Sequence, residues 1–296
     1  MAMAEAIRPL RALTNYLLGE DDQHSPPLPD GLSPDLSAVI SQHVEMLVEF
    51  QNTEYAALYL DRLGRFHDRY GISSGLFREI ADLLALRMSF NDPIRVAQII
   101  LRRAPQADPV AGRIDPPNGL YRPEIREIVE MLPRDQAESL ADGLMAIKML
   151  RGRLRIHVDR GKGPLLLRLF VRCRRLRPSS LRFVRENSSV ERWLHMIDRS
   201  LAKCPDAVAE VVRSAAIVSG YGASYHLSLT NWNLAINKLA KPVFDGELDL
   251  PQLPAALAQV RSAAGADLSG EELRRVIADV LTSARPVTAA AASRPV

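Results

Sequence analysis

The stretch SPDLSAVISQHVEMLVEFQNTEYAALYLDRL, residues 33–63, decides the fold class of this chain. Apolar residues recur in it every three or four positions, the spacing of one helix face. They include Leu36, Val39, Ile40, Val44 and Leu47. Ser33 supplies a helix N-cap and Pro34 the first helical position. The pattern predicts a long helix that continues, with a kink near Asn52, to about residue 63.

Helical patterns fill most of the chain on either side of this stretch. We expect two helices with an interruption, one over residues 74–103, broken at Asp92 and Pro93, and one over 123–150, broken at Pro133. Further helices are expected over residues 163–178, 180–203, 205–220, 251–264 and 269–284, and one more that begins at Asn231. Residues 153–158 alternate between apolar and polar side chains, as a short strand does. With 5% aromatic residues and no fixed repeat, the sequence predicts a mostly α, multi-helix, bundle-like domain with at most a short strand near 153–158.

The chain has three expected parts. Residues 1–34 combine a short amphipathic helix with a Pro-rich linker, residues 35–284 form a single helical domain, and residues 285–296 are a small-residue tail expected to be disordered. Two cysteines, Cys173 and Cys204, are too few for a disulfide framework or an iron–sulfur cluster. The sequence lacks the continuous apolar core of a secretory signal and any run long enough for a membrane span. We therefore expect a cytoplasmic protein.

A basic band covers residues 151–185. It holds 12 of the 38 Lys and Arg residues and a single acid, Asp159, whereas the remainder has 26 basic and 34 acidic residues. The formal net charge of +3 therefore combines +11 in the band with −8 elsewhere. Because like charges on one surface repel each other, such a band faces either a negative partner or the acids of its own chain.

Five arginines of the band are candidate ligand- or partner-binding residues. Two consecutive helices carry them: Arg168, Arg172 and Arg175 on the first, Arg182 and Arg185 on the second. We expect Leu169 and Phe170 to pack on the opposite face of the first helix. The guanidinium fork suits phosphate and carboxylate groups, which indicates an anion-binding surface. The alternative is a solvated helix face paired with the molecule's own acids. The absence of a recognisable reader motif argues against nucleic-acid binding.

No complete catalytic, metal or cofactor motif can be read from the sequence. Glu191 and His195 lie four apart on one helix face, which is more typical of a surface hydrogen bond than of a metal site. Glu45 and Glu49 are expected to be ordinary exposed helix carboxylates. Gly220, Tyr221 and Gly222 offer a fragment of a nucleotide-binding glycine pattern, and a helix-end turn is the default reading.

Four segments together carry a family resemblance. They are EFQNTEYAALYLDRL, LALRMSFNDPIRVA, RPSSLRFVRENSSVERWL and IVSGYGASYHLSLTNW, in that order. Over about residues 35–239 the chain resembles the helical C-terminal domain of indolepyruvate oxidoreductase β-subunit-like proteins. These are similar to the indolepyruvate:ferredoxin oxidoreductases, which decarboxylate arylpyruvates with thiamine diphosphate and iron–sulfur clusters.

The resemblance implies an accessory role. Thiamine-binding sequence and cluster cysteines are lacking here, so we expect no cofactors on this chain and place both on partner subunits, if any. The family pattern has ionisable residues where this chain has Asn52, Ser219, Ala223 and Tyr225, which removes groups that acid/base chemistry needs.

The resemblance thus favours a non-catalytic helical subunit or domain that docks to the catalytic subunit of a 2-oxoacid:ferredoxin oxidoreductase-type assembly. The alternative is a binding protein for a small anion (an aryl 2-oxoacid, coenzyme A or a nucleotide), with the arginine face and the turn from Gly220 to Tyr225 lining the pocket. Nucleic-acid binding is the third hypothesis.

Overall fold

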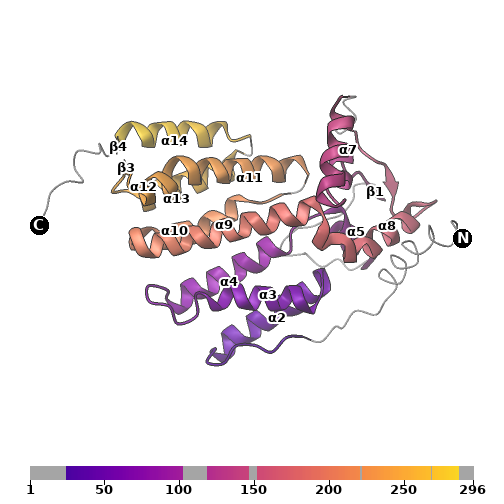
Figure 1. Cartoon of the computed structure of the whole chain (residues 1–296), viewed down its shortest axis with the longest axis horizontal. Helices are drawn as coiled ribbons and strands as arrows, with labels where there is room; N and C mark the ends of the chain where they lie inside the picture. The colour runs from indigo at the N-terminus through magenta and orange to yellow at the C-terminus, as the bar shows by residue number, and fades with distance from the viewer. Residues whose placement is uncertain (1–24, 103–118, 147–151, 221, 268, 287–296) are drawn as a thin grey trace, which may run out of the picture. The chain divides into compact units, whose positions relative to one another are not determined.

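The computed structural model describes residues 25–102, 119–146, 152–220, 222–267 and 269–286, and its helices confirm the mostly α fold (Figure 1). Contacts divide the chain into two compact units. Unit 1 comprises the described residues up to Gly64 together with those from Met88 to Asn187. Unit 2 comprises residues 65–87 and those from 188 onward. The helical region expected as one domain therefore contains two units. The expected N-terminal helix lies outside the described residues, as does the expected tail apart from residues 285 and 286.

Side-chain caps mark the start of two helices in unit 1. Ser33 Oγ accepts a hydrogen bond from the backbone N–H of Leu36 at 3.4 Å, as the sequence predicts for an N-cap. Asn52 Oδ1 accepts from the Tyr55 N–H at 2.9 Å, so a second helix begins there in place of the expected kink. The helices are α2 (Pro34–Phe50), α3 (Thr53–Gly64), α5 (Pro93–Arg102), α6 (Ile125–Val129), α7 (Arg134–Ala146), α8 (Gly163–Arg172) and the 3-10 helix η3 (Cys173–Ser179).

A two-stranded antiparallel sheet supports the start of α8. Strand β2 (Ile156–His157) lies within the stretch where a strand is expected, and its partner is β1 (Leu120–Tyr121). Helix α8 begins so close to β2 that a Cβ on Gly163 would lie 1.5 Å from the His157 carbonyl oxygen. Glycine at this position therefore allows the helix to approach the strand backbone, and α8 then packs against α5.

Aromatic rings form the centre of unit 1. The Phe50 ring lies 5.8 Å from that of Tyr55 and 5.2 Å from that of Phe90, and Tyr55 in turn lies 5.2 Å from Phe183. The Tyr55 hydroxyl donates to the Met88 carbonyl at 2.9 Å. Burial raises the pKa of Tyr55 well above its usual value, so this hydroxyl is a structural hydrogen-bond donor.

Unit 2 is helical and has a second small sheet. Its elements are α4 (Ser74–Met88, whose last residue belongs to unit 1), most of α9 (Leu181–Lys203), α10 (Val208–Arg213), α11 (Ala223–Ala235), α12 (Lys241–Asp245), α13 (Leu253–Ala266), α14 (Glu271–Ser283) and the paired strands β3 (Leu248–Asp249) and β4 (Arg285–Pro286). Helix α11 begins eight residues before the expected start at Asn231. Helices α13 and α14 pack against each other (Figure 1).

Two tryptophans anchor the core of unit 2. Trp193 and Trp232 are fully buried. The Trp193 indole N–H donates to the Val211 carbonyl at 3.2 Å, and that of Trp232 donates to Ser214 Oγ at 3.1 Å. Both rings therefore bury their apolar area while their single polar group stays bonded. None of the described helices has the length and apolar character of a membrane span.

Candidate anion-binding site

One arginine of the basic band is part of the core of unit 1. The Arg177 guanidinium donates to both Asp92 carboxylate oxygens, at 2.8 and 3.0 Å, and to the Phe50 carbonyl. It also lies 3.9 Å above the Phe50 ring. The side chain of Arg177 is completely buried, and that of Asp92 nearly so. Three of the four segments that carry the family resemblance thus meet at the buried Arg177 guanidinium.

Two of the candidate arginines are bound to internal acids. Arg182 is buried, pairs with Glu186 at 2.7 Å and lies 3.7 Å from Glu130. The half-exposed Arg185 pairs with the same buried Glu130 at 3.1 Å. These contacts tie the beginning of α9 to α6, where the Arg182 N–H also donates to the Glu130 carbonyl at 3.0 Å. For Arg182 and Arg185 the partner is the protein's own acidic residues.

The remaining candidates lie on α8 and η3. Along α8 the side chains of Leu167 and Phe170 are buried, whereas those of Arg168, Leu169 and Arg172 are exposed. The expected packing of Leu169 is therefore wrong. Leu169 follows Leu167 by two positions, about 200° around the helix, so it points away from the face that packs on α5. Neither Arg168 nor Arg172 forms an ion pair with a described residue.

A pocket of about 470 Å³ opens beside this helix, within unit 1. Helices α2 and α5 contribute one half of its lining, and the end of α8 with the start of η3 contributes the other. Its lining residues are Glu49, Gln98, Leu101, Arg102, Val171, Arg172, Arg174 and Arg175. Four guanidinium groups and one carboxylate therefore meet there. We call this the arginine pocket. Of the predicted residues it contains Arg172 and Arg175; Arg168 is not part of its lining.

Glu49 organises one wall of the arginine pocket. Its carboxylate accepts from Arg95 at 2.9 Å and also pairs with Arg102. Its backbone carbonyl, in the last turn of α2, accepts from Gln98 at 3.3 Å and from Arg174 at 3.1 Å. The last turn of α2 contains no basic residue of its own, so arginines from distant segments bind the carbonyls left open at its end. The expectation that Glu49 is an ordinary exposed carboxylate is wrong.

The electrostatics of the pocket favour an anion. The pKa of the Arg174 guanidinium is lowered by its burial, and further by the charges of Arg177 and Arg175. Arg174 is thus a cation held among other cations. An anion bound beside it would reduce this repulsion, and guanidinium forks bind phosphate or carboxylate oxygens in pairs.

Arg102, Arg174, Gln98 and Glu49 are the polar pocket residues that sequence reasoning missed. Arg174 carried a signal, since it lies within the basic band next to Arg175. The other three carried none, because α2 and α5 approach η3 only through folding across distances of 70 or more positions in the chain.

The predicted glycine turn belongs to unit 2 and is a structural turn. Gly220 and Gly222 have positive φ angles of 91° and 59°, conformations that glycine adopts without strain, and Tyr221 lies outside the described residues. Ser228 Oγ holds the turn by accepting from the Ser219 N–H at 3.1 Å and donating to the Ser219 carbonyl at 2.7 Å. Tyr225 is buried. The arginine pocket is lined entirely by unit 1, so the turn does not belong to its lining.

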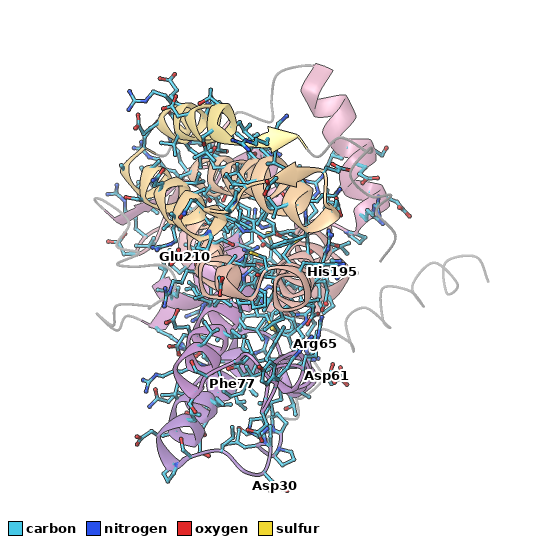
Figure 2. The ribbon with its side chains drawn as sticks, turned by 90° about the vertical axis from the view of Figure 1, so that its left-hand side faces the viewer. Asp30, Asp61, Arg65, Phe77, His195 and Glu210 are labelled. Atoms are coloured by element: carbon cyan, nitrogen blue, oxygen red, sulfur yellow. The ribbon has the colours of Figure 1, made fainter. Side chains whose placement is uncertain are left out.

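Glu191 and His195 both lie on the exposed side of α9. Glu191 accepts from Arg65 at 3.1 Å (Figure 2 labels His195 and Arg65). Within the described residues, no group of three or more His, Cys, Asp or Glu side chains has the arrangement of a metal site. The arginine pocket is therefore the strongest candidate site in the described part of the chain.

The chain matches one family model. Residues 36–238 match a family of unknown function, DUF6537. No curated protein and no solved structure matches the chain. The matched range includes the whole arginine pocket and ends before α12, α13 and α14. Because the match covers well over half of the 296 residues, the chain belongs to the DUF6537 family.

Proposed function

We propose that this chain is a non-catalytic helical module that binds an anionic group in the arginine pocket and serves a 2-oxoacid oxidoreductase-type assembly. One observation carries the binding function: Arg102, Arg172 and Arg175 meet at one pocket, and the lining holds a single carboxylate, that of Glu49. Since Glu49 is already paired with two arginines, the positive charge of the pocket is only partly neutralised.

The lining favours an oxygen-rich ligand. Leu101 and Val171 are its apolar residues, whereas six of its eight residues are charged or amide-bearing. Four of the eight lining residues are arginines, whose guanidinium forks bind phosphate oxygens in pairs. The phosphates of coenzyme A or of a nucleotide therefore match more of the lining than the single carboxylate of an aryl 2-oxoacid does. Its volume of about 470 Å³ accommodates a diphosphate group with part of its nucleoside.

A thermal-shift series on the full chain tests anion binding. ATP, coenzyme A and phenylpyruvate are compared at millimolar concentration and at matched ionic strength. A ligand at 100 times its Kd adds about 2.7 kcal/mol to the stability of the folded state, so the phosphorylated ligands should raise Tm clearly. The double variant Arg172→Ala/Arg175→Ala should lose this shift, whereas Arg168→Ala, outside the pocket, should keep it. No shift with any of the three ligands would contradict the proposal.

The assembly part of the proposal is supported by the four-segment resemblance, which spans almost the same residues as the family match. In this proposal, partner subunits hold the thiamine diphosphate and the iron–sulfur clusters, and the complex is cytoplasmic. Affinity purification of the full chain from its native cells should recover a thiamine-dependent catalytic protein in stoichiometric amount. A monomer recovered without any partner would rule this part out.

Nucleic acid is the competing polyanion for a basic surface. A phosphate backbone that contacts several arginines gives an affinity that falls steeply with salt, by a slope of about −0.9 per phosphate contact for a duplex. A salt titration with a fluorescent DNA duplex distinguishes nucleic-acid binding from the binding of a small anion. We expect weak binding with a shallow slope, because Arg177, Arg182 and Arg185 are occupied by internal acids.

A further inference from the structure

One side of α8 carries an unusual exposed pattern. Leu165, Arg168, Leu169 and Arg172 occupy positions i, i+3, i+4 and i+7, so they form one continuous stripe along the helix. All four residues are exposed, and the opposite side, with Leu167 and Phe170, is the side that is buried. We call these four residues the α8 stripe.

The two leucines of the stripe are far more exposed than leucines normally are. Leu165 is 67% exposed and Leu169 is 53% exposed, the highest values among the large aliphatic side chains in the described part of the chain. Apolar residues at this spacing are ordinarily the buried face of a helix. Two adjacent leucines on a helix surface match the anchor positions by which helices recognise each other.

The arginines of the stripe indicate the charge of the partner. Arg168 and Arg172 flank the leucines and form no ion pair with a described residue. A second copy of the same stripe would place guanidinium groups against guanidinium groups, which disfavours self-association. A membrane surface is disfavoured because two leucines bury little apolar area for insertion.

We propose that the α8 stripe is a docking surface for an acidic amphipathic helix of a partner protein. Apolar side chains of that helix cover Leu165 and Leu169, while its Asp or Glu residues pair with Arg168, the arginine of the stripe that lies outside the arginine pocket. The stripe alone is smaller than a stable interface of about 800 Å² per partner, so it forms the anchor of a larger contact. Only the identity of the partner, a catalytic subunit, rests on the proposed function.

Site-directed photocrosslinking tests this surface. Benzoylphenylalanine replaces Leu165, or in a second protein Leu169, in the full chain, and the crosslinked peptide is identified by mass spectrometry after irradiation in native extract. A matched control carries the same probe at Tyr70, which is 99% exposed and lies in unit 2. We expect one peptide of amphipathic, acidic sequence at both α8 positions and not at Tyr70.

Several results would overturn the docking surface. Crosslinks to a second copy of this chain, to lipid, or to a peptide without acidic residues would do so, as would equal capture at Tyr70 or none at α8. An acidic helix from a protein without thiamine diphosphate would support the docking surface and contradict the proposed assembly. The two proposals therefore fail separately.

A charge swap gives the decisive readout. Arg168→Glu should lower complex formation at least tenfold, and replacing the facing partner acid with Lys should restore it. Arg168 lies outside the arginine pocket, so the thermal shift with ligand should persist in this variant and show that unit 1 is folded. Loss of complex without rescue by any partner Lys would contradict the proposed ion pairs.

Discussion

At the scale of single residues, arginines of the same basic band have different roles because their surroundings in the folded chain differ. Arg177 is fully buried and bonded to Asp92 and the end of α2, Arg182 bonds Glu186, and Arg172 lines the pocket. Their neighbours in the folded chain, and not their sequence context, separate these roles. Burying a cation costs free energy unless it is paired and hydrogen-bonded, as Arg177 is.

Replacing Arg177 should destabilise unit 1 severely. Arg177→Met keeps most of the volume but leaves the Asp92 carboxylate buried without its partner. Removal of one member of a buried ion pair costs about 3–5 kcal/mol. Urea unfolding at pH 7 measures the change. Arg168→Met is the control, because an exposed arginine without a described partner should change stability by less than about 0.5 kcal/mol. Equal stability of the two variants would show that the Asp92 pair is not structural.

Glu127 should make stability depend on pH. Its burial, opposed by a hydrogen bond from the Glu124 N–H and reinforced by the Glu124 and Glu130 carboxylates, raises its pKa to about 7. The unfolded chain has a Glu pKa of about 4.3. Between these two pKa values, Glu127 holds a proton in the folded state that it has lost in the unfolded state. The stability that this proton contributes is therefore complete below about pH 4.3 and is lost as pH rises through 7.

The variant Glu127→Gln isolates this effect. Gln retains the capping-box hydrogen bond to the Glu124 N–H but does not ionise. Relative to wild type, the variant should gain stability on going from pH 5 to pH 8, by at most about 3 kcal/mol, since one pKa unit corresponds to 1.36 kcal/mol. Urea midpoints of both proteins at the two pH values give the difference. Parallel pH profiles would mean that Glu127 titrates normally.

At the scale of elements, the position of α8 depends on a backbone contact. Gly163 begins α8 directly against the His157 carbonyl of β2, and this contact fixes where the helix starts. The buried side of α8 then faces α5, which brings Arg172 to the lining that Gln98 and Arg102 share. Leu165, Arg168 and Leu169 of the α8 stripe are exposed for the same reason.

Gly163→Ala should therefore displace α8. No rotamer can relieve a clash between Cβ and a backbone oxygen, and forced packing of this kind costs about 1–3 kcal/mol or more. We expect lower stability together with weaker ligand binding in the thermal-shift assay. Gly75→Ala in α4 is a suitable control, because a Cβ at that position meets nothing within 4 Å. Unchanged ligand binding in Gly163→Ala would show that the pocket does not depend on where α8 starts.

At the scale of the whole molecule, both proposed binding sites belong to unit 1. The arginine pocket and the α8 stripe are both formed by its residues. Helices α13 and α14 belong to unit 2 and lie beyond the family match. A ligand that binds unit 1 stabilises the folded state of that unit and therefore suppresses its local openings most directly.

Hydrogen exchange should reveal this division. Saturating ATP is expected to slow amide exchange in α5 and α8, while exchange that occurs by local opening in α13 and α14 stays unchanged. The double variant Arg172→Ala/Arg175→Ala serves as the control and should show no slowing. Protection confined to α13 and α14 would place the ligand in unit 2 and contradict the arginine pocket.

The sequence by itself determined the helical class, the cap at Ser33, the strand at Ile156 and the concentration of arginines that contains part of the candidate site. These depend on neighbours within a few positions, so periodicity and capping chemistry reveal them. Tertiary structure alone decided which arginines line the pocket. Glu49 and Arg102 join Arg172 from distant helices, and the rotation of α8 exposes Leu169. Such pairings depend on the packing of one helix against another, which local sequence does not specify.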